Sequence, residues 1–379
     1  MSLAIAGMGW ITPLGSGVDS VWERLLQGEE AHAEKIAEKF DDQSYTVFRV
    51  PDSALASLAP HSRLRRASLI SRFAAAAGLA ALEEAGVRLD SRNADRVALV
   101  FAISNGGVIY TKRFYRDIVG SGAQSASPLF FPETVFNAPA SHLAAILGIT
   151  SATYTLVGDG AVGLLAIRMA EDLMANDALD YCLVVGAEEV DWLLCDAYRK
   201  WRLLRLEPPV EPFNEVAKGM ILSEGAGAVL LAREGLIKIE STHAGGYYRK
   251  RHEAEEVLKR ILCDLTEAEP ESGFIIASAN GTFIDKAECR AISQVIPDAV
   301  VYTPKPALGE SVGAGGLWQV IVGGQALRHG ELPPLLHVAS KIPLRISASR
   351  AAAATARRAI VLSCGLNQQI AGLCLGADR

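Results

Sequence analysis

This sequence of 379 residues lacks an apolar run long enough to cross a membrane. A transmembrane helix needs roughly 18 consecutive apolar residues, and polar or charged residues interrupt every hydrophobic stretch before that length. The N-terminal segment also lacks a basic region followed by an uninterrupted hydrophobic stretch. We therefore expect a soluble cytoplasmic protein that inserts into no membrane.

The sequence also lacks an excess of positive charge. Its formal net charge is −6 at pH 7, so it has no basic field that would hold nucleic acid, and we expect no nucleic-acid partner. The arginines of segment 63–72 form only a local cluster. Two interpretations of this cluster stay open: a solvated loop and helix start, or a docking surface for an acidic protein.

The cysteines lack the CxxC spacing of metal and redox sites. Each of the six stands alone in an apolar or helical segment, which predicts buried, reduced thiols. Neither of two glycine-rich turns has the spacing of a phosphate-binding loop. We therefore expect no metal and no cofactor. The cysteines are Cys182, Cys195, Cys263, Cys289, Cys364 and Cys374.

Half of the residues are hydrophobic and only 21% are charged, which is typical of a large interior or an extensive subunit interface. Apolar segments alternate with longer helical ones, and this alternation predicts an α/β protein. Helices are expected at 69–85 and 161–174. Strands are expected at 3–7, 97–102, 152–157, 181–186 and 228–232, and again at 237–242, 273–277, 300–303, 359–363 and 372–375.

The two parts of the chain follow the same plan, which predicts an N-terminal half, 1–235, and a C-terminal half, 236–379. In each half a strand leads into a glycine-rich turn and then a helix of small residues. These turns are 157–163 and 309–316. Small residues allow a helix to pack closely between sheets, so we expect both helices to be deeply buried.

Several motifs occur in an order and spacing that one family shares. They are Ile5-Ala-Gly-Met-Gly-Trp-Ile-Thr-Pro-Leu-Gly15, Ser127-Pro-Leu-Phe-Phe-Pro132, Glu211-Pro-Phe-Asn214, Gly219-Met-Ile-Leu-Ser-Glu-Gly-Ala-Gly227, Ala279-Asn-Gly-Thr282 and Thr303-Pro-Lys305. Through these motifs the whole chain resembles the β-ketoacyl synthase family of the thiolase fold. That resemblance implies two duplicated α/β halves forming a five-layer α-β-α-β-α body.

The resemblance implies a site whose usual chemistry this chain has largely lost. Ketosynthases acylate a cysteine at the start of a buried helix, where the helix dipole stabilises the thiolate. Two further polar residues, usually histidines, and a lysine complete the array. The cysteine position falls on Gly160 and the histidine positions fall on Asn280 and Glu310. Only Lys305 keeps the residue of the family.

Each replacement changes what its position can do. Asn280 can donate a hydrogen bond to a thioester carbonyl but carries no proton that titrates near neutral pH. An ionised Glu310 would repel the enolate that forms on decarboxylation, and we expect it to form an ion pair with Lys305. Leu366 replaces the usual gating phenylalanine, and Gln319 replaces a family glutamate.

Two neighbouring residues are alternatives for the missing nucleophile. Cys364 borders the predicted site, but no base is evident beside it, which favours a packing role. Asp159 lies at the predicted start of the buried helix, where capping and dipole stabilisation explain a carboxylate.

Ketosynthase-like chains without the cysteine resemble the chain-length-factor subgroup. Such proteins pair with an active ketosynthase and limit how far the acyl chain grows, so we expect this ketosynthase and an acyl carrier protein as partners. Candidates for the tunnel or interface are Phe130, Phe131, Phe136, Trp192 with its neighbours to Cys195, and Leu366, and ordinary core packing explains each of them equally well.

Two other functions remain open. One is a divergent 3-oxoacyl-acyl-carrier-protein synthase-like acyltransferase that uses Lys305, Asn280 and Glu310 without a covalent acyl-enzyme. The other is a homodimeric acyl-carrier binding protein that has no partner synthase.

Overall fold

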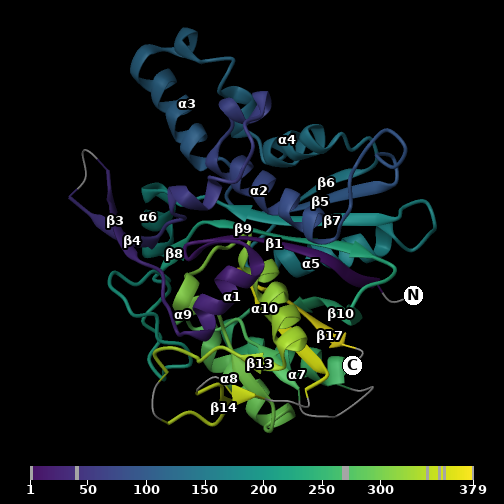
Figure 1. Ribbon diagram of the computed structural model, residues 1–379. Coiled ribbons are helices and arrows are strands. Elements are labelled where there is room, and N and C mark those ends of the chain that lie inside the picture. Colours follow the sequence, from purple (N-terminus) through teal and green to yellow (C-terminus); the bar gives the residue numbers. More distant parts are fainter. Residues whose placement is uncertain are drawn as a thin grey trace.

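The computed structural model describes residues 3–38, 42–266, 273–338, 341–348, 351–352 and 356–377. One large β-sheet runs through both halves of the chain (Figure 1). From edge to edge its main path is β14 (Arg345–Ile346), β12 (Val300–Tyr302), β11 (Phe274–Ile276), β16 (Arg358–Cys364), β17 (Gln369–Ala377), β10 (Ile237–Tyr247), β1 (Leu3–Thr12), β9 (Gly225–Ala232), β7 (Tyr181–Glu188), β5 (Val97–Ile103) and β6 (Thr153–Val157).

The two halves meet where β1 pairs antiparallel with β10. On the N-terminal side, β7, β5 and β6 are parallel to one another, and in β5 every residue is buried. A strand covered on both faces has no solvent side, which is why β5 is uniformly apolar rather than alternating. The predicted boundary between 235 and 236 falls between β9 and β10, and the division into two halves remains a prediction.

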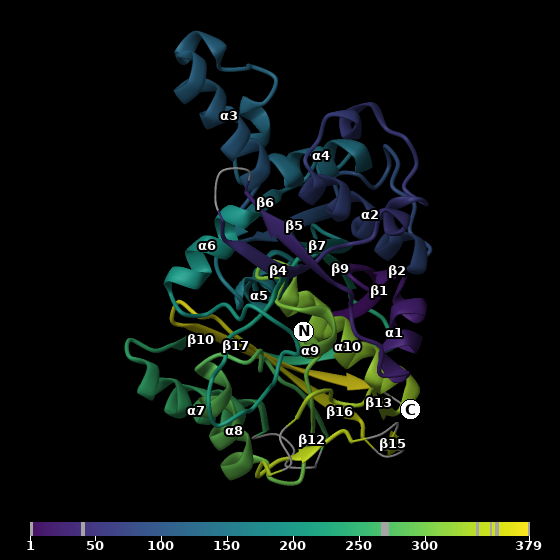
Figure 2. The ribbon, with the colours of Figure 1, turned by 90° about the vertical axis from the view of Figure 1, so that its left-hand side faces the viewer.

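The helices form three layers (Figures 1 and 2). One outer layer covers the strands of the N-terminal part, the other covers the strands of the C-terminal part, and the central layer lies between these two sets of strands. The outer layers are α2 (Leu69–Glu84) with α4 (Ala138–Leu147), and α7 (Ala254–Thr266) with α8 (Ile284–Val295). The central layer is α5 (Val162–Leu173) and α10 (Gly315–His329), which pack on each other and on strands of both halves. The predicted five-layer thiolase-like fold is confirmed, with the two helices of small residues at its centre.

Close packing of α2 on β1 depends on glycine. A Cβ atom at Gly9 would lie 1.9 Å from the carbonyl oxygen of Ala77. The small residues of α2 therefore rest directly on the backbone of the strand, a contact that a side chain at Gly9 would prevent.

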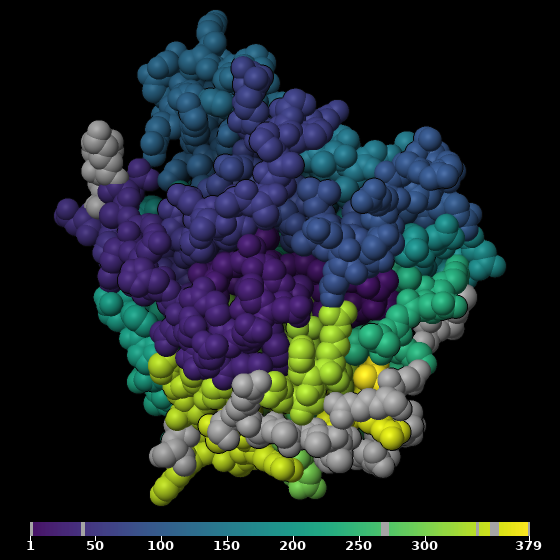
Figure 3. Space-filling model, in the orientation of Figure 1, coloured from purple at the N-terminus to yellow at the C-terminus, as the bar shows by residue number. Residues whose placement is uncertain are grey.

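The remaining elements lie around this body. A small sheet consists of β3 (Ala33–Ala37), β4 (Ser44–Phe48) and β8 (Leu222–Ser223), and β13 (Glu331–Leu332) pairs with β15 (Ala351–Ala352). Short elements are β2 (Gly15–Ser16), α1 (Val18–Leu26), α6 (Trp192–Lys200) and α9 (Lys305–Leu308). The helix α3 (Val108–Ser121) projects from the body together with the 3-10 turn η4 (Phe131–Thr134), as the space-filling view also shows (Figure 3).

All predicted strands and helices are present, with ends that shift by a few residues. The largest shifts are in β1, predicted to end at residue 7, which continues to Thr12, and in β10, predicted to end at residue 242, which continues to Tyr247 because β17 pairs with it past two register shifts. Five cysteines are buried as predicted, but Cys263 is exposed on α7, so that prediction was wrong for this residue. Within the described ranges, no helix combines the length and apolarity needed to cross a membrane.

Candidate functional site

The site begins at Gly160, between the end of β6 and the start of α5. The sequence places a turn there, and α5 starts two residues later with Ala161 as its N-cap. The Gly160 carbonyl oxygen accepts a hydrogen bond from the Ser363 hydroxyl at 2.5 Å. A Cβ atom at Gly160 would lie 3.0 Å from the carbonyl oxygen of Cys364. The position thus has the expected place at a buried helix start, but β16 leaves little room for a side chain.

Lys305, Glu310 and Asn280 form one buried network. Glu310 Oε2 accepts hydrogen bonds from Lys305 Nζ at 2.7 Å and from Asn280 Nδ2 at 2.6 Å. The exposed fractions of these residues are 3% for Lys305, 4% for Glu310 and 2% for Asn280. The predicted ion pair is therefore confirmed, and it lies out of water, where removal of one partner is costly.

Ser278 connects this network to the Gly160 turn. Its hydroxyl oxygen lies 3.3 Å from Lys305 Nζ and accepts the backbone N–H of Cys364 at 2.9 Å. Cys364 in turn contacts Gly160. The structure therefore brings the four predicted positions together, although they are separated by up to 150 residues in sequence. Ser278 was missed, because a lone serine near the end of a strand carries no signal in the sequence.

Asn280 is held by a buried carboxylate beneath it. Asp285 Oδ1 accepts the N–H of Asn280 at 3.0 Å, and Oδ2 accepts the N–H of Gly281 at 2.8 Å. Gly281 has a φ of 89°, and its Cβ would lie 2.6 Å from the carbonyl oxygen of Gly219, so only glycine fits this turn. Burial raises the pKa of Asp285 to about 6.

The network offers acceptors where an enolate or oxyanion would need donors. The amide N–H of Asn280 is directed to Glu310, and its Oδ1 accepts from the Thr282 hydroxyl at 2.7 Å. Glu310 Oε1 is buried and has no hydrogen-bond partner in the described part of the chain. A developing negative charge would meet a carboxylate rather than a donor at this point.

Gln319 joins α10 to the strands behind the site. Its Nε2 donates to the backbone carbonyl oxygens of Ala277 and Leu362, both at 2.7 Å. Ala277 directly follows β11 and Leu362 lies within β16, so a fully buried amide fixes the separation of these two neighbouring segments. A neutral donor suits two converging carbonyls, which explains why an amide is compatible with this position.

Comparisons with known proteins agree with this arrangement. The family model for the β-ketoacyl synthase N-terminal domain matches residues 2–235, and that for the C-terminal domain matches residues 236–339. The chain belongs to the β-ketoacyl synthase family. It is 24% identical over 366 residues to the 3-oxoacyl-[acyl-carrier-protein] synthase 2 of Coxiella burnetii, covering 89% of this chain and 88% of that one.

Solved ketosynthases have the same fold. A chain of the ishigamide ketosynthase/chain length factor superposes with a TM-score of 0.88 and 22% identity, covering 100% of this chain and 99% of that chain. A chain from a type II polyketide synthase acyl-carrier protein in complex with its ketosynthase gives a TM-score of 0.82 at 15% identity, with coverage of 100% and 99%. At these identities the likeness establishes the fold alone.

The cysteine beside the ketosynthase site is not activated. Burial raises the pKa of the Cys364 thiol well above its ordinary value of 9.0. Burial also raises the pKa values of Cys182 and Cys195 to about 12. A nucleophilic cysteine needs a stabilised thiolate, so none of these three thiols has the electrostatic environment of a family nucleophile.

Asp159 lies beside the start of α5 as expected, although the N-cap residue itself is Ala161. The Asp159 Oδ2 accepts the N–H of Asn367 at 2.6 Å, and its Oδ1 would lie only 2.0 Å from a Cβ at Gly365. Asp159 therefore fastens the turn between β16 and β17 to the Gly160 segment. Burial raises the pKa of this carboxyl group.

A cleft of about 780 Å³ lies over this turn. Asp159 and Leu366 line it, whereas Lys305, Glu310 and Asn280 do not. The cleft thus ends at the turn, which separates it from the buried network. Aromatic and basic residues that the sequence analysis did not single out form its walls: Tyr198, Trp201, Tyr247 and Arg251.

The other tunnel candidates lie in two separate places. Phe130 and Phe131 lie at the start of η4, which projects together with α3, and Phe136 follows η4; Phe131 is 57% and Phe136 is 45% exposed. Trp192 instead packs against Tyr45 in an internal cluster, and its indole N–H donates to the carbonyl oxygen of Gln43 at 2.8 Å. The structure thus separates Trp192 from the phenylalanines, and only Leu366 borders the cleft.

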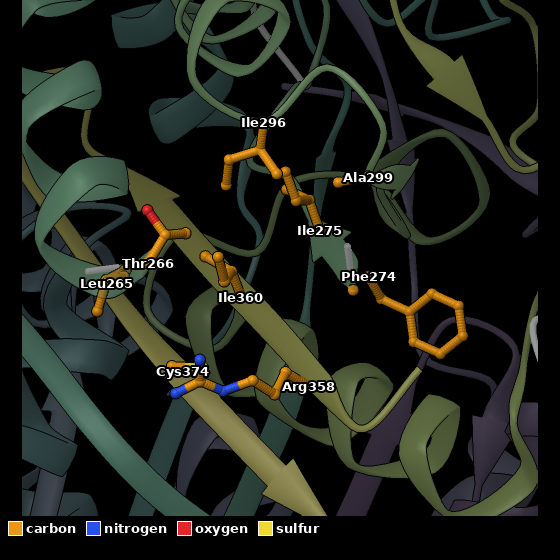
Figure 4. A pocket seen from close by; sticks show the side chains of 10 residues that line it. Leu265, Thr266, Phe274, Ile275, Ile296, Ala299, Arg358, Ile360 and Cys374 are labelled. Atoms are coloured by element: carbon orange, nitrogen blue, oxygen red, sulfur yellow. The ribbon is translucent and has the colours of Figure 1, made fainter. Parts of the chain in front are cut away.

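Another crevice lies between α7 and the strands β11, β16 and β17 (Figure 4). It is mostly apolar and encloses about 10 Å³, which is close to the minimum for one water molecule. It cannot hold an acyl group. Within the described ranges, no group of three or more histidine, cysteine or acidic side chains is arranged to hold a metal ion.

The buried carboxyl group of Glu288 predicts how stability depends on pH. Burial raises its pKa from 4.5 to about 8, so the folded state binds its proton more tightly than the unfolded state. The contribution of Glu288 to the free energy of unfolding should therefore be largest below pH 4.5 and should decrease as the pH rises to about 8. The variant Glu288→Gln should lose this part of the slope and gain relative stability above neutral pH.

Urea unfolding of both proteins across this pH range measures the effect. The exposed Glu256, also changed to glutamine, is the matched control and should leave the slope unchanged. Parallel pH profiles for the wild type and Glu288→Gln would contradict the assignment.

Proposed function

We propose that this chain is a non-catalytic ketosynthase-like subunit of the chain-length-factor type, which shapes the acyl tunnel of an active ketosynthase partner. The observation that carries the proposal is Gly160. It stands at the start of α5, where the family carries its nucleophile, and the described cysteine nearest to it, Cys364, is buried and neutral. Without a nucleophile this chain forms no acyl-enzyme of the usual kind.

The hydrogen bonds of Glu310 and Asn280 favour the same proposal over a divergent acyltransferase. An acyltransferase without a covalent intermediate needs a positioned base and a donor for the thioester oxygen. Glu310 is bound to Lys305, and Asn280 donates to Glu310. Both groups are therefore bound to each other, and neither lines the cleft.

An unpaired sheet edge supports the expected partner. Among the described strands, β6 pairs with β5 alone, and Tyr154 and Val157 on it are 44% and 55% exposed. Large apolar side chains are also exposed on the projecting region, including Val119 at 86%. Exposed sheet edges and apolar patches of this kind are common sites of subunit association. A related ketosynthase chain is the occupant that we propose.

The exposed positive charge of segment 63–66 is compatible with binding of an acyl carrier protein as well. Arg63, Arg65 and Arg66 are all exposed on and beside the 3-10 turn η2 (Ser62–Arg65), and they have no ion pair among the described residues. Free guanidinium groups attract an acidic protein. Of the two interpretations of this arginine cluster, we propose the docking surface.

Substitution at the sheet edge tests the partner interface. Val157→Lys should weaken association with a ketosynthase partner at least tenfold, because a buried ammonium would replace an apolar contact. The thermal stability of the isolated chain should change little, since the side chain is exposed there. Val216→Lys, at a position that is 66% exposed in a loop, is the matched control. Equal binding by both variants, measured by calorimetry, would exclude β6 from the interface.

Intact-mass measurement tests the function itself. The chain is incubated with acyl carrier protein thioesters, first alone and then with a candidate ketosynthase from the same genome. We expect no acyl adduct on this chain and condensation only in the mixture. A partner whose own nucleophilic cysteine is changed to alanine is the control and should abolish condensation. A stoichiometric adduct on Cys364 would overturn the proposal.

A further inference from the structure

A second pocket lies away from Gly160, between the small sheet and the start of α2. It encloses about 300 Å³, which is at the lower end of small-molecule sites. Residues that follow β4, the 3-10 turn η1 (Asp52–Leu55), the first turns of α2 and the segment before β9 enclose it. These elements can be followed in Figure 1.

A buried carboxylate holds an arginine at this pocket. Glu224 is 2% exposed, and its Oε1 accepts a hydrogen bond from Arg49 Nε at 3.4 Å. Its Oε2 accepts the backbone N–H of Val190 at 3.2 Å. Glu224 is therefore occupied on both oxygens, and it fixes the arginine through the ε nitrogen alone.

The two terminal nitrogens of Arg49 remain free. Neither has a hydrogen-bond or ion-pair partner among the described residues, and the side chain is 34% exposed at the pocket. A guanidinium group presents its terminal nitrogens as a fork that matches the two oxygens of a carboxylate. The polar end of this pocket is thus built to receive a carboxylate.

The rest of the lining defines the other features of a ligand. Leu55, Leu69 and Phe73 supply an apolar surface. Two exposed carboxylates, Glu34 and Asp52, also line the pocket. They would repel a simple anion, but they would attract a cationic group on the same small molecule.

We propose that this pocket binds a small zwitterion, namely an α-amino acid with an apolar side chain. The carboxylate of the ligand pairs with the Arg49 fork, its ammonium group faces Glu34 and Asp52, and its side chain rests against Leu55, Leu69 and Phe73. This site is separate from the Gly160 network, so it does not depend on the proposed function.

Calorimetric titration of the full chain with leucine tests the proposal, with isocaproate and isoamylamine as analogues that lack the amino group and the carboxylate. Leucine should bind more tightly than either analogue. Arg49→Gln should weaken leucine binding at least tenfold, because the variant loses the charged hydrogen-bonded pair between Arg49 and the leucine carboxylate. Arg88→Gln, at an exposed arginine outside the pocket, should leave binding unchanged.

Arg49→Gln removes the counter-ion of Glu224 and can destabilise the chain, so a second variant is needed. Leu55→Trp fills the pocket and keeps the Arg49–Glu224 pair, and it should abolish leucine binding while the circular dichroism and melting temperature stay close to those of the wild type. The proposal is overturned if leucine does not bind at millimolar concentration, or if isoamylamine binds as tightly as leucine. It is also overturned if Leu55→Trp binds normally, or if only a peptide C-terminus binds, which would indicate a protein partner.

Discussion

Glu310→Ala is expected to lower the free energy of unfolding by about 3–5 kcal/mol, the usual cost of breaking a buried ion pair on one side. Lys305, which is 3% exposed, would retain among the described residues only the Ser278 hydroxyl as a partner for its Nζ. Asn280 would lose the acceptor for its amide N–H at the same time. Urea unfolding monitored by circular dichroism measures the loss.

The matched control is a lysine–glutamate pair on the surface. Lys35 and Glu207 form an ion pair whose side chains are 51% and 68% exposed, so Glu207→Ala should cost no more than about 1 kcal/mol. The double variant Lys305→Met with Glu310→Leu removes both charges and should recover most of the loss. If Glu310→Ala cost no more than Glu207→Ala, the network would not be a structural element, and a substrate-binding role for Glu310 would become the better explanation.

Gln319→Glu is expected to be nearly as damaging, through a different cause. The amide nitrogen donates to the carbonyl oxygens of Ala277 and Leu362 at 2.7 Å, and the side chain is fully buried. A carboxylate would place an ionised oxygen against two carbonyl oxygens in a dry environment. Burying an unpaired charge in this way costs several kcal/mol, so the melting temperature should fall by many degrees.

The pH dependence of this variant provides a sensitive test. Burial and the facing carbonyls would raise the pKa of the new carboxyl group in the folded state, so the destabilisation should be small at acid pH and should grow as the pH rises. A protonated carboxyl can still donate one hydrogen bond to a carbonyl. Gln319→Met, which has a similar volume and does not titrate, should be destabilised equally at all pH values. A pH-independent loss in Gln319→Glu would contradict this explanation.

Secondary structure and fold were largely accessible from the sequence, because they depend on local patterns and on motif order. Uniformly apolar segments such as 97–102 predicted buried strands, and the two glycine-rich turns predicted the central helices. The sequence also placed Gly160 at a helix start and predicted the Lys305–Glu310 pair. The end of β10 was set wrongly, because pairing with β17 is a long-range effect that no local pattern reports.

The site was only partly accessible, because its geometry depends on contacts between distant segments. No motif in the sequence distinguishes Ser278 from other serines, and only the fold brings it between Lys305 and Cys364. The sequence placed Asp159 beside a helix start, but its bond to the N–H of Asn367, in the turn after β16, forms only in the folded chain. The walls of the cleft come from α6, β10 and the segments beside them, and no motif links these elements.

The order and spacing of the motifs in the amino-acid sequence were therefore enough to predict the fold, and they placed Gly160, which has no side chain, at the start of α5. The surroundings of that position depended on the tertiary structure. Among the described residues, folding joins Lys305, Glu310 and Asn280 in one buried hydrogen-bonded network, leaves the terminal nitrogens of Arg49 without a partner at a pocket, and places β6 at an edge of the sheet. Hydrogen-bond partners and burial are properties of segments that meet in space, so they appear only when the chain is folded.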